Sequence, residues 1–122
     1  MLKKRPRILL ADDHPGILSA FQRMLEPACD VVGIIKNGRD IIEAVTTLKP
    51  EVVVLDLSLP SVNGLQACKE IKAVAPQTKV VMVSVSDDVD VTREALRLGA
   101  SAFLVKNLAA SELQTTINRL FA

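Results

Sequence analysis

The sequence predicts a single α/β domain over residues 1–122, built on an open parallel β-sheet with helices on both faces. Five short apolar runs rich in Val and Ile alternate with longer amphipathic segments, as in repeated β/α units. The length of 122 residues is also typical of one domain. Because β/α crossovers are right-handed, five such units favour a flavodoxin-like sheet with strand order 2-1-3-4-5.

The five apolar runs show little polar alternation, which is typical of strands covered on both faces. Pro and Gly residues fall between the elements, where they end secondary structure. The predicted strands are Arg7–Ala11, Val31–Ile35, Val52–Leu55, Lys79–Val83 and Ala102–Val105.

Apolar residues three or four positions apart predict a helix after each strand. The fourth helix, near Val89–Leu98, is the least apolar, and Gly99 stands where a helix commonly ends. The apolar positions of the five helices are, in order, Ile17, Phe21, Met24 and Leu25; Ile41, Val45 and Leu48; Leu65, Cys68 and Ile71; Val91, Ala95 and Leu98; and Leu113, Ile117 and Leu120.

The composition narrows the classes of partner. Aromatic residues make up only 2% of the chain, which argues against a surface that stacks the bases of single-stranded nucleic acid. The net charge of +1 attracts neither a polyanion nor an anionic membrane, and no apolar run is long enough to cross a bilayer. We therefore expect no membrane contact, and DNA contact only through a further domain outside these residues.

The two cysteines, Cys29 and Cys68, lie 39 residues apart in apolar stretches, and only His14 is available to join them in binding a metal. This spacing excludes a soft-metal site. We interpret both as buried thiols in a reducing cytoplasm, while sequence alone leaves a disulfide open.

Polar residues follow the predicted strands at the edge of the sheet where such folds bind ligands. They are Asp12, Asp13, Asp56, Ser84 and Lys106. Taken singly each has an ordinary explanation; Asp13, for example, stands where it could cap the helix that follows. Together, three carboxylates at one edge would raise each other's pKa unless a cation lay between them. A hard, oxygen-preferring ion such as Mg²⁺ suits this set.

With Mg²⁺ bound, this set of residues suits phosphoryl transfer to a carboxylate. Asp56 is the best nucleophile because it ends a central strand, whereas Asp12 and Asp13 are placed to hold the metal. Lys106 would contact a phosphoryl oxygen, and the Ser84 hydroxyl would donate to another. The product would be an acyl phosphate on Asp56.

These residues resemble the receiver domains of two-component response regulators over Arg7 to about Leu120, nearly the whole chain. The matching segments are Ile8-Leu9-Leu10-Ala11-Asp12-Asp13-His14, Val54-Leu55-Asp56-Leu57-Ser58-Leu59-Pro60-Ser61-Val62-Asn63-Gly64, Val83-Ser84, and Gly99-Ala100-Ser101-Ala102-Phe103-Leu104-Val105-Lys106. The resemblance implies that Asp56 accepts phosphate from a sensor histidine kinase or a phosphotransfer protein. It also implies Mg²⁺ held by Asp13, the Asp56 side chain and the Ser58 backbone carbonyl, with Asp12 one layer further out.

The resemblance further implies a switch rather than an enzyme with an external substrate. Ser84 and Phe103 occupy the family's switch positions, and the fourth helix, fifth strand and fifth helix form the surface that reads the switch. A phosphorylation-dependent homodimer would form at the same surface. Physically, the added dianion shifts the populations of two loop states.

Two departures from the family pattern stand out. Asn107 follows Lys106 where the family commonly has Pro, which puts the usual cis peptide in doubt, and Phe103 replaces the commoner Tyr. The Asp-Asp-His-Pro start and the residue after Lys106 look most like receivers of the LuxR/NarL type. Those normally precede a helix-turn-helix DNA-binding domain, so transcription control is the expected output.

Other functions stay open at this level. A stand-alone receiver would act by protein–protein contact, and a receiver-like domain could bind partners without phosphate. A haloacid-dehalogenase-like phosphatase would carry a second Asp where Ser58 stands. A flavin binder lacks the Trp or Tyr to stack on its ring. His14 is a phosphoryl relay or a plain helix-start residue, and Ser58 and Ser86 either tune water access or are ordinary loop serines.

Overall fold

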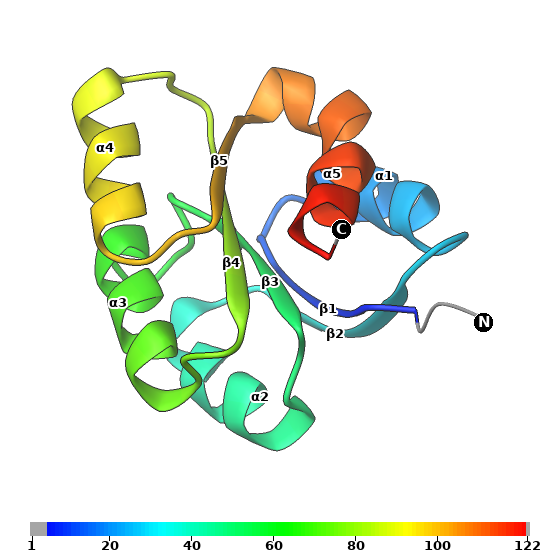
Figure 1. Ribbon diagram of the computed structural model, residues 1–122, viewed down its shortest axis with the longest axis horizontal. Coiled ribbons are helices and arrows are strands. Elements are labelled where there is room, and N and C mark those ends of the chain that lie inside the picture. Colours follow the sequence, from blue (N-terminus) through cyan, green and yellow to red (C-terminus); the bar gives the residue numbers. More distant parts are fainter. Residues whose placement is uncertain (1–4, 122) are drawn as a thin grey trace.

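The computed structural model describes residues 5–121, apart from the side chains of residues 108 and 110. Strands and helices alternate along the chain (Figure 1). The elements are β1 (Arg7–Ala11), α1 (Pro15–Leu25), β2 (Asp30–Ile35), the 3-10 turn η1 (Gly38–Asp40), α2 (Ile41–Leu48), β3 (Val52–Asp56), α3 (Gly64–Val74), β4 (Lys79–Ser84), α4 (Val89–Arg97), β5 (Ala102–Val105) and α5 (Lys106–Leu120).

The five strands form one parallel sheet in the order β2-β1-β3-β4-β5, which confirms the predicted fold and topology. Strand β2 begins one residue earlier than predicted, and β3 and β4 run one residue further, because Asp56 pairs with Val83 and Ser84 pairs with Val105 in the ladder. Both polar residues therefore belong to strands rather than to the loops after them. Within the described part of the chain, no helix is both long and apolar enough to cross a membrane.

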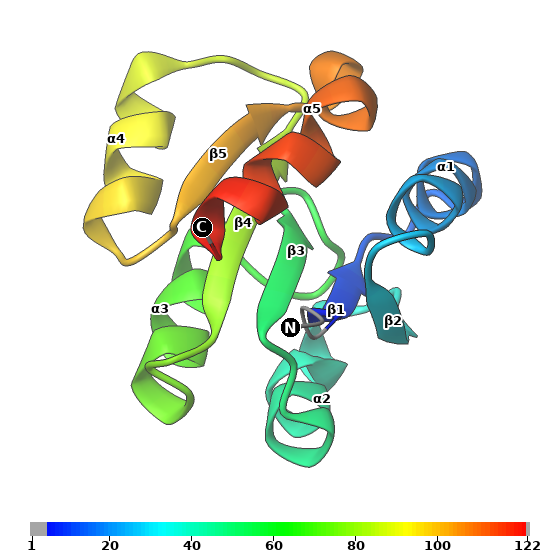
Figure 2. The same ribbon diagram turned by 45° about the vertical axis from the view of Figure 1, so that its right-hand side comes forward.

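Helices cover both faces of the sheet. Helices α1 and α5 lie on one face, and α2, α3 and α4 lie on the other (Figures 1 and 2). Each face has its own apolar core, one centred on residues such as Phe21 and Ile117 and the other on residues such as Leu55 and Ile71. All five residues of β3 are buried, as its central place in the sheet requires.

Side chains cap the first turns of α1, α3 and α4. His14 caps α1, since its Nδ1 accepts a hydrogen bond from the Ile17 N–H at 3.2 Å, and Asp13 makes no such bond. A helix cap at Asp13 is therefore not its role in this structure. Gly99 follows α4 with φ of 111°, the left-handed conformation that glycine adopts at little cost, as its predicted place at the helix end requires.

Both cysteines are free and buried, and they lie in different cores on opposite faces of the sheet. Burial raises the pKa of each thiol, despite a hydrogen bond from Gln114 to Cys29 and the charge of Lys72 near Cys68. The disulfide that the sequence left open is absent from this structure.

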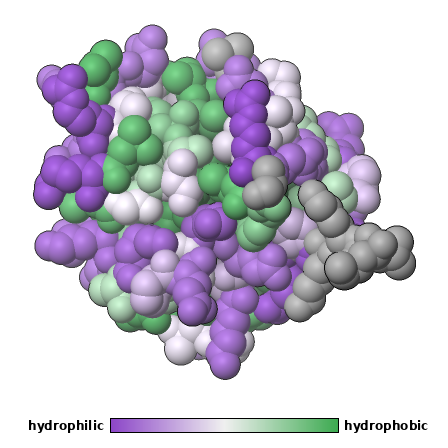
Figure 3. Space-filling view, viewed as in Figure 1, coloured by the Kyte–Doolittle hydropathy of each residue, from purple (hydrophilic) through white to green (hydrophobic). Residues whose placement is uncertain are grey.

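Helix α4 is the least embedded of the helices. Ala95 is its one fully buried residue, whereas Val89 and Leu96 are 65% and 48% exposed. In the space-filling view, apolar side chains gather between α4 and α5, over β5 (Figure 3). The weak attachment agrees with the low apolar content that the sequence shows for this helix.

Phe21 tests the core beneath α1. Its ring is 1% exposed, so Phe21→Ala should leave a cavity and lower the free energy of unfolding by about 3–5 kcal/mol. Urea denaturation followed by far-ultraviolet circular dichroism measures this change. Phe121→Ala is the matched control, because that ring is 36% exposed and its contact with Lys79 contributes about 1 kcal/mol at most. Equal losses in the two variants would contradict the assigned core.

Candidate functional site

Three aspartates meet at the carboxyl edge of the sheet. Strand β1 pairs with β3 so that Ala11 lies beside Leu55, and the next residues along, Asp12 and Asp56, are therefore neighbours. One carboxylate oxygen from each of Asp12, Asp13 and Asp56 lies within 4.8 Å of the others. Asp12 and Asp56 are each 3% exposed, whereas Asp13 faces solvent. The sequence therefore predicted this grouping correctly.

Lys106 supplies the positive charge between the two buried carboxylates. Its Nζ lies 3.2 Å from Asp12 Oδ2 and 3.2 Å from Asp56 Oδ2. Helix α5 begins at Lys106, directly after β5, and none of the described peptide bonds is cis. Burial lowers the pKa of Lys106, but the charges and hydrogen bonds of Asp12 and Asp56 outweigh it, so its pKa is raised.

Backbone amides fix the other oxygen of each buried carboxylate. Asp12 Oδ1 accepts a hydrogen bond from the His14 N–H at 2.9 Å, and Asp56 Oδ1 accepts one from the Ser58 N–H at 3.0 Å. In both cases the amide two residues further along the chain donates to the aspartate side chain, a common turn-forming contact. These donors were not predicted from the sequence, although aspartates at the start of loops are the signal for such turns.

Ser84 and Phe103 lie on the two strands beyond β3. Ser84 is 2% exposed at the end of β4, and its hydroxyl oxygen accepts a hydrogen bond from the Ser86 N–H at 3.2 Å. Its hydroxyl proton is not used in that bond. Phe103, on β5, is partly buried and packs against the core beneath α2, α3 and α4. Ser58 is exposed in the loop that follows Asp56.

The aspartates suit a hard divalent cation. They offer carboxylate oxygens close together, which Mg²⁺ prefers, and the exposed Asp13 leaves room for the water ligands that Mg²⁺ retains. Two of the carboxylates are already oriented by backbone amides, so little ordering is needed on binding. The donor set and its setting therefore fit the predicted metal.

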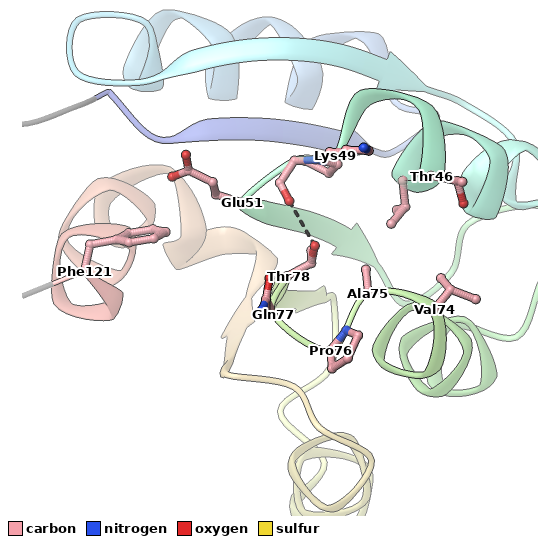
Figure 4. Close-up of a pocket in the computed structure, with 11 residues that line it drawn as sticks. Thr46, Lys49, Glu51, Val74, Ala75, Pro76, Gln77, Thr78 and Phe121 are labelled. Carbon is pink, nitrogen blue, oxygen red and sulfur yellow. Dashed lines mark hydrogen bonds between the residues drawn. The ribbon is translucent and has the colours of Figure 1, made fainter.

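A cleft lies elsewhere in the described molecule, at the opposite edge of the sheet. It is a cleft of about 620 Å³ between the ends of α2 and α3 and the start of β3, with Phe121 at one side (Figure 4). The Thr78 hydroxyl donates to the Pro50 carbonyl across it at 2.9 Å, the bond drawn as a dashed line in Figure 4. None of the aspartates at the carboxyl edge lines this cleft.

A parallel sheet with a lysine-bridged aspartate cluster at its carboxyl edge defines a receiver-type signalling domain, and sequence comparison agrees. Residues 8–118 match the family model of the response regulator receiver domain. The chain belongs to that family, and its general function is phosphorylation-dependent signalling in two-component systems.

The relatives include one protein that this chain matches over nearly its whole length and two regulators that it matches over about half of theirs. The chain is 32% identical over 120 residues to the chemotaxis protein CheY of Thermotoga maritima, and the alignment covers 93% of this chain and 96% of CheY. It is 33% identical over 115 residues to the transcriptional regulatory protein YxjL of Bacillus subtilis, with 93% of this chain and 53% of YxjL covered. The nitrate/nitrite response regulator NarL of Escherichia coli is 32% identical over 117 residues, with 94% and 54% covered. The chain thus spans about half the length of these two regulators.

Solved structures give the same result. The signal receiver domain of a NarL response regulator from Mycobacterium tuberculosis superposes with a TM-score of 0.85 at 26% identity, covering 97% of each chain. The response regulator domain of Thermotoga maritima CheB gives a TM-score of 0.84 at 29% identity, covering 95% of this chain and 96% of that one. The likeness to NarL-type receivers supports the subfamily that the sequence suggested.

Lys106→Met tests the charge balance of the site. Without the ammonium group, Asp12 and Asp56 face each other uncompensated, so the free energy of unfolding at pH 7 without Mg²⁺ should fall by about 1–3 kcal/mol. Added Mg²⁺ should restore more stability to the variant than to the wild type. Lys69→Met, at an exposed position on α3, is the matched control and should change little.

The difference in free energy of unfolding between the wild type and Lys106→Met should also depend on pH. Because the folded-state pKa of Lys106 is raised above its ordinary 10.5, its charge stabilises the fold fully at neutral pH. That contribution is lost as the pH rises through the raised value, so the wild type and Lys106→Met should converge in stability in strongly alkaline buffer. A difference that grows with pH would contradict the assignment.

Proposed function

We propose that this chain is a receiver switch that takes a phosphoryl group onto Asp56. The observation that carries the proposal is the Lys106 ammonium, 3.2 Å from both Asp12 and Asp56, beside a third carboxylate from Asp13. With Mg²⁺ held by the aspartates, the metal and the Lys106 ammonium group would together neutralise the incoming dianion. Asp56 is the acceptor because it ends the central strand β3 and its carboxylate is oriented by the Ser58 amide.

In the transfer step, an Asp56 carboxylate oxygen attacks the phosphorus of a phosphohistidine or a small acyl phosphate. A new O–P bond forms as the bond from phosphorus to the donor breaks, and the leaving group keeps that electron pair. The product is an acyl phosphate on Asp56. Lys106 then exchanges its contact with Asp56 Oδ2 for a phosphoryl oxygen, which keeps the ammonium group paired throughout.

In this proposal the metal would be held by Asp13, the Asp56 side chain and the Ser58 backbone carbonyl. Asp12 would lie outside these direct ligands and orient them. When bound, Mg²⁺ supplies the positive charge that screens the phosphoryl oxygens from the carboxylates. Asp12 already receives Lys106 and the His14 amide, so its two oxygens have partners without the metal. Asp56 has the same kinds of partner, Lys106 and the Ser58 amide, so the place of Asp12 outside the direct ligands rests on the family resemblance.

The switch proceeds through Ser84 and Phe103 in this proposal. The Ser84 hydroxyl, whose proton is free of the Ser86 bond, donates to the phosphoryl group, and the partly buried Phe103 ring moves into the space that opens. The surface of α4, β5 and α5 then changes, and a phosphorylated homodimer or another partner reads it. The apolar area over β5 in Figure 3 supports this surface as the readout.

We further propose that the donor is a sensor histidine kinase or a phosphotransfer protein and that the output is transcription. The regulators YxjL and NarL support this output, and this chain covers 53% and 54% of their lengths. A helix-turn-helix domain outside these residues would then contact DNA. The two free, buried thiols support a reducing cytoplasm as the location. In this proposal the chain acts on no external substrate, and it catalyses only its own phosphorylation and slow dephosphorylation.

Asp56→Asn tests the acceptor. Wild-type protein incubated with Mg²⁺ and acetyl phosphate should gain one phosphoryl group by intact-mass spectrometry, and the variant should gain none because an amide is a poor nucleophile. The added group should be labile, as expected of an acyl phosphate. Asp40→Asn, an exposed aspartate at the start of α2, is the control and should be phosphorylated like the wild type. An adduct that persists in Asp56→Asn would refute the assignment, and rapid turnover of many phosphoesters would favour a phosphatase.

Asp13→Ala tests the metal assignment. Because Asp13 is exposed and bears no structural bond, the variant should keep its fold while its phosphorylation by acetyl phosphate loses its Mg²⁺ dependence and falls at least tenfold. Circular dichroism checks the fold, and the initial rate at several Mg²⁺ concentrations checks the dependence. Normal Mg²⁺-dependent phosphorylation of the variant would remove Asp13 from the metal site.

A further inference from the structure

The loop between β3 and α3, residues 57–63, is held by a glycine from the connection between β2 and α2. Gly38, the first residue of η1 after β2, donates its N–H to the Pro60 carbonyl at 2.7 Å. Gly38 is buried, so this bond is shielded from water. The contact joins the β2–α2 connection to the loop that carries Ser58.

No side chain fits at Gly38. A Cβ there would collide with Cγ1 and Cβ of Val62 and would lie 3.0 Å from the Pro60 carbonyl oxygen. Asn37 holds the glycine in this place, since its side chain accepts from the Arg39 N–H at 3.0 Å and its carbonyl accepts from the Asp40 N–H at 3.1 Å. The close approach of residue 38 to Pro60 and Val62 therefore requires glycine. It also depends on the turn that the hydrogen bonds of Asn37 hold in place.

The rest of the loop is anchored at both ends but not at its tip. Leu57 donates to the Val83 carbonyl at 2.8 Å, Leu59 is 2% exposed, and a Cβ on Gly64 would lie 2.6 Å from the Leu57 carbonyl oxygen. At the tip, Ser61 has φ of 69°, a conformation that costs a non-glycine residue on the order of 1 kcal/mol. Such a conformation at Ser61 persists only where the surrounding structure holds it. The hydrogen bond from Gly38 reaches Pro60, the residue directly before Ser61.

We infer that Gly38 is a positioning residue for the Mg²⁺ site: by holding Pro60 and Val62, it sets where the Ser58 backbone lies beside Asp56. This inference rests on the proposed function, in which the Ser58 carbonyl is a metal ligand. Ser58 lies two residues before Pro60, and its N–H already bonds Asp56 Oδ1 at 3.0 Å. A displaced Pro60 therefore moves both the carbonyl and the amide that orients the acceptor.

The test is Gly38→Ala with Mg²⁺ titrated into phosphate-free protein by isothermal titration calorimetry. The added methyl group pushes Val62 outward, so Mg²⁺ should bind about tenfold more weakly, the usual effect of losing support around a metal ligand. Gly33→Ala, on β2, is the matched control. Its Cβ would also be tight, 2.7 Å from Leu48 Cδ1, but it touches no residue of the loop, so stability should fall without a change in Mg²⁺ affinity.

A second background separates positioning from general damage. Val62→Gly removes the two Val62 atoms that the new methyl group would meet most closely and leaves only the Pro60 carbonyl oxygen at 3.0 Å, so Gly38→Ala added to it should change Mg²⁺ affinity much less than in the wild type. Val62→Leu presses on the same contact from the loop side and keeps the test available if Gly38→Ala fails to fold. It should also weaken Mg²⁺ binding.

The outcomes separate this inference from the proposed function. Wild-type Mg²⁺ binding with equal affinity in folded Gly38→Ala would overturn the inference alone, as would an equal loss in the wild-type and Val62→Gly backgrounds. A wild-type protein that binds no Mg²⁺ would overturn the proposed function and this inference with it. Weaker binding in Gly38→Ala, unchanged binding in Gly33→Ala and the smaller effect in Val62→Gly would support the inference.

Discussion

Two carboxylates that are nearly out of water cannot remain charged side by side without a cation, and this constraint shapes the receiver site. Asp12 and Asp56 are each 3% exposed, and Lys106 lies 3.2 Å from both. Such a group of charges is stable only as a set, because removing one partner leaves another buried and unpaired. Lys106 offsets only part of the negative charge of the aspartates. The site therefore still attracts cations, and under this condition a metal and then a phosphoryl group bind well.

The sheet order supplies the geometry that this constraint demands. Adjacent β1 and β3 bring Asp12 next to Asp56, and the end of β5 delivers Lys106 across β4. The buried strands β3 and β4 fix the backbone at the edge from which Asp56 and Ser84 project.

Much of this arrangement follows from local sequence patterns. Apolar runs and helical spacing predict the elements, and the rule that parallel strands present ligand sites at their carboxyl ends predicts the meeting of Asp12, Asp13, Asp56 and Lys106. What could not be predicted depends on contacts between distant residues. The burial of Leu18 rather than Ile17 is set by how α1 tilts onto its core, and the pairing that extends β4 to Ser84 depends on β5. The contact of Gly38 with Pro60 likewise joins residues that no short pattern relates.

Helix α4 has one fully buried residue, whereas the aspartates and Lys106 are set by the central strands and by the first turn of α5. Elements with few buried contacts open locally at a lower free energy than the rest of a domain. The chain therefore combines a rigid chemical centre with a segment whose opening leaves that centre intact. In the proposed switch, substitutions on the exposed side of α4 would therefore change the affinity for a partner there without removing any contact of the aspartates or Lys106.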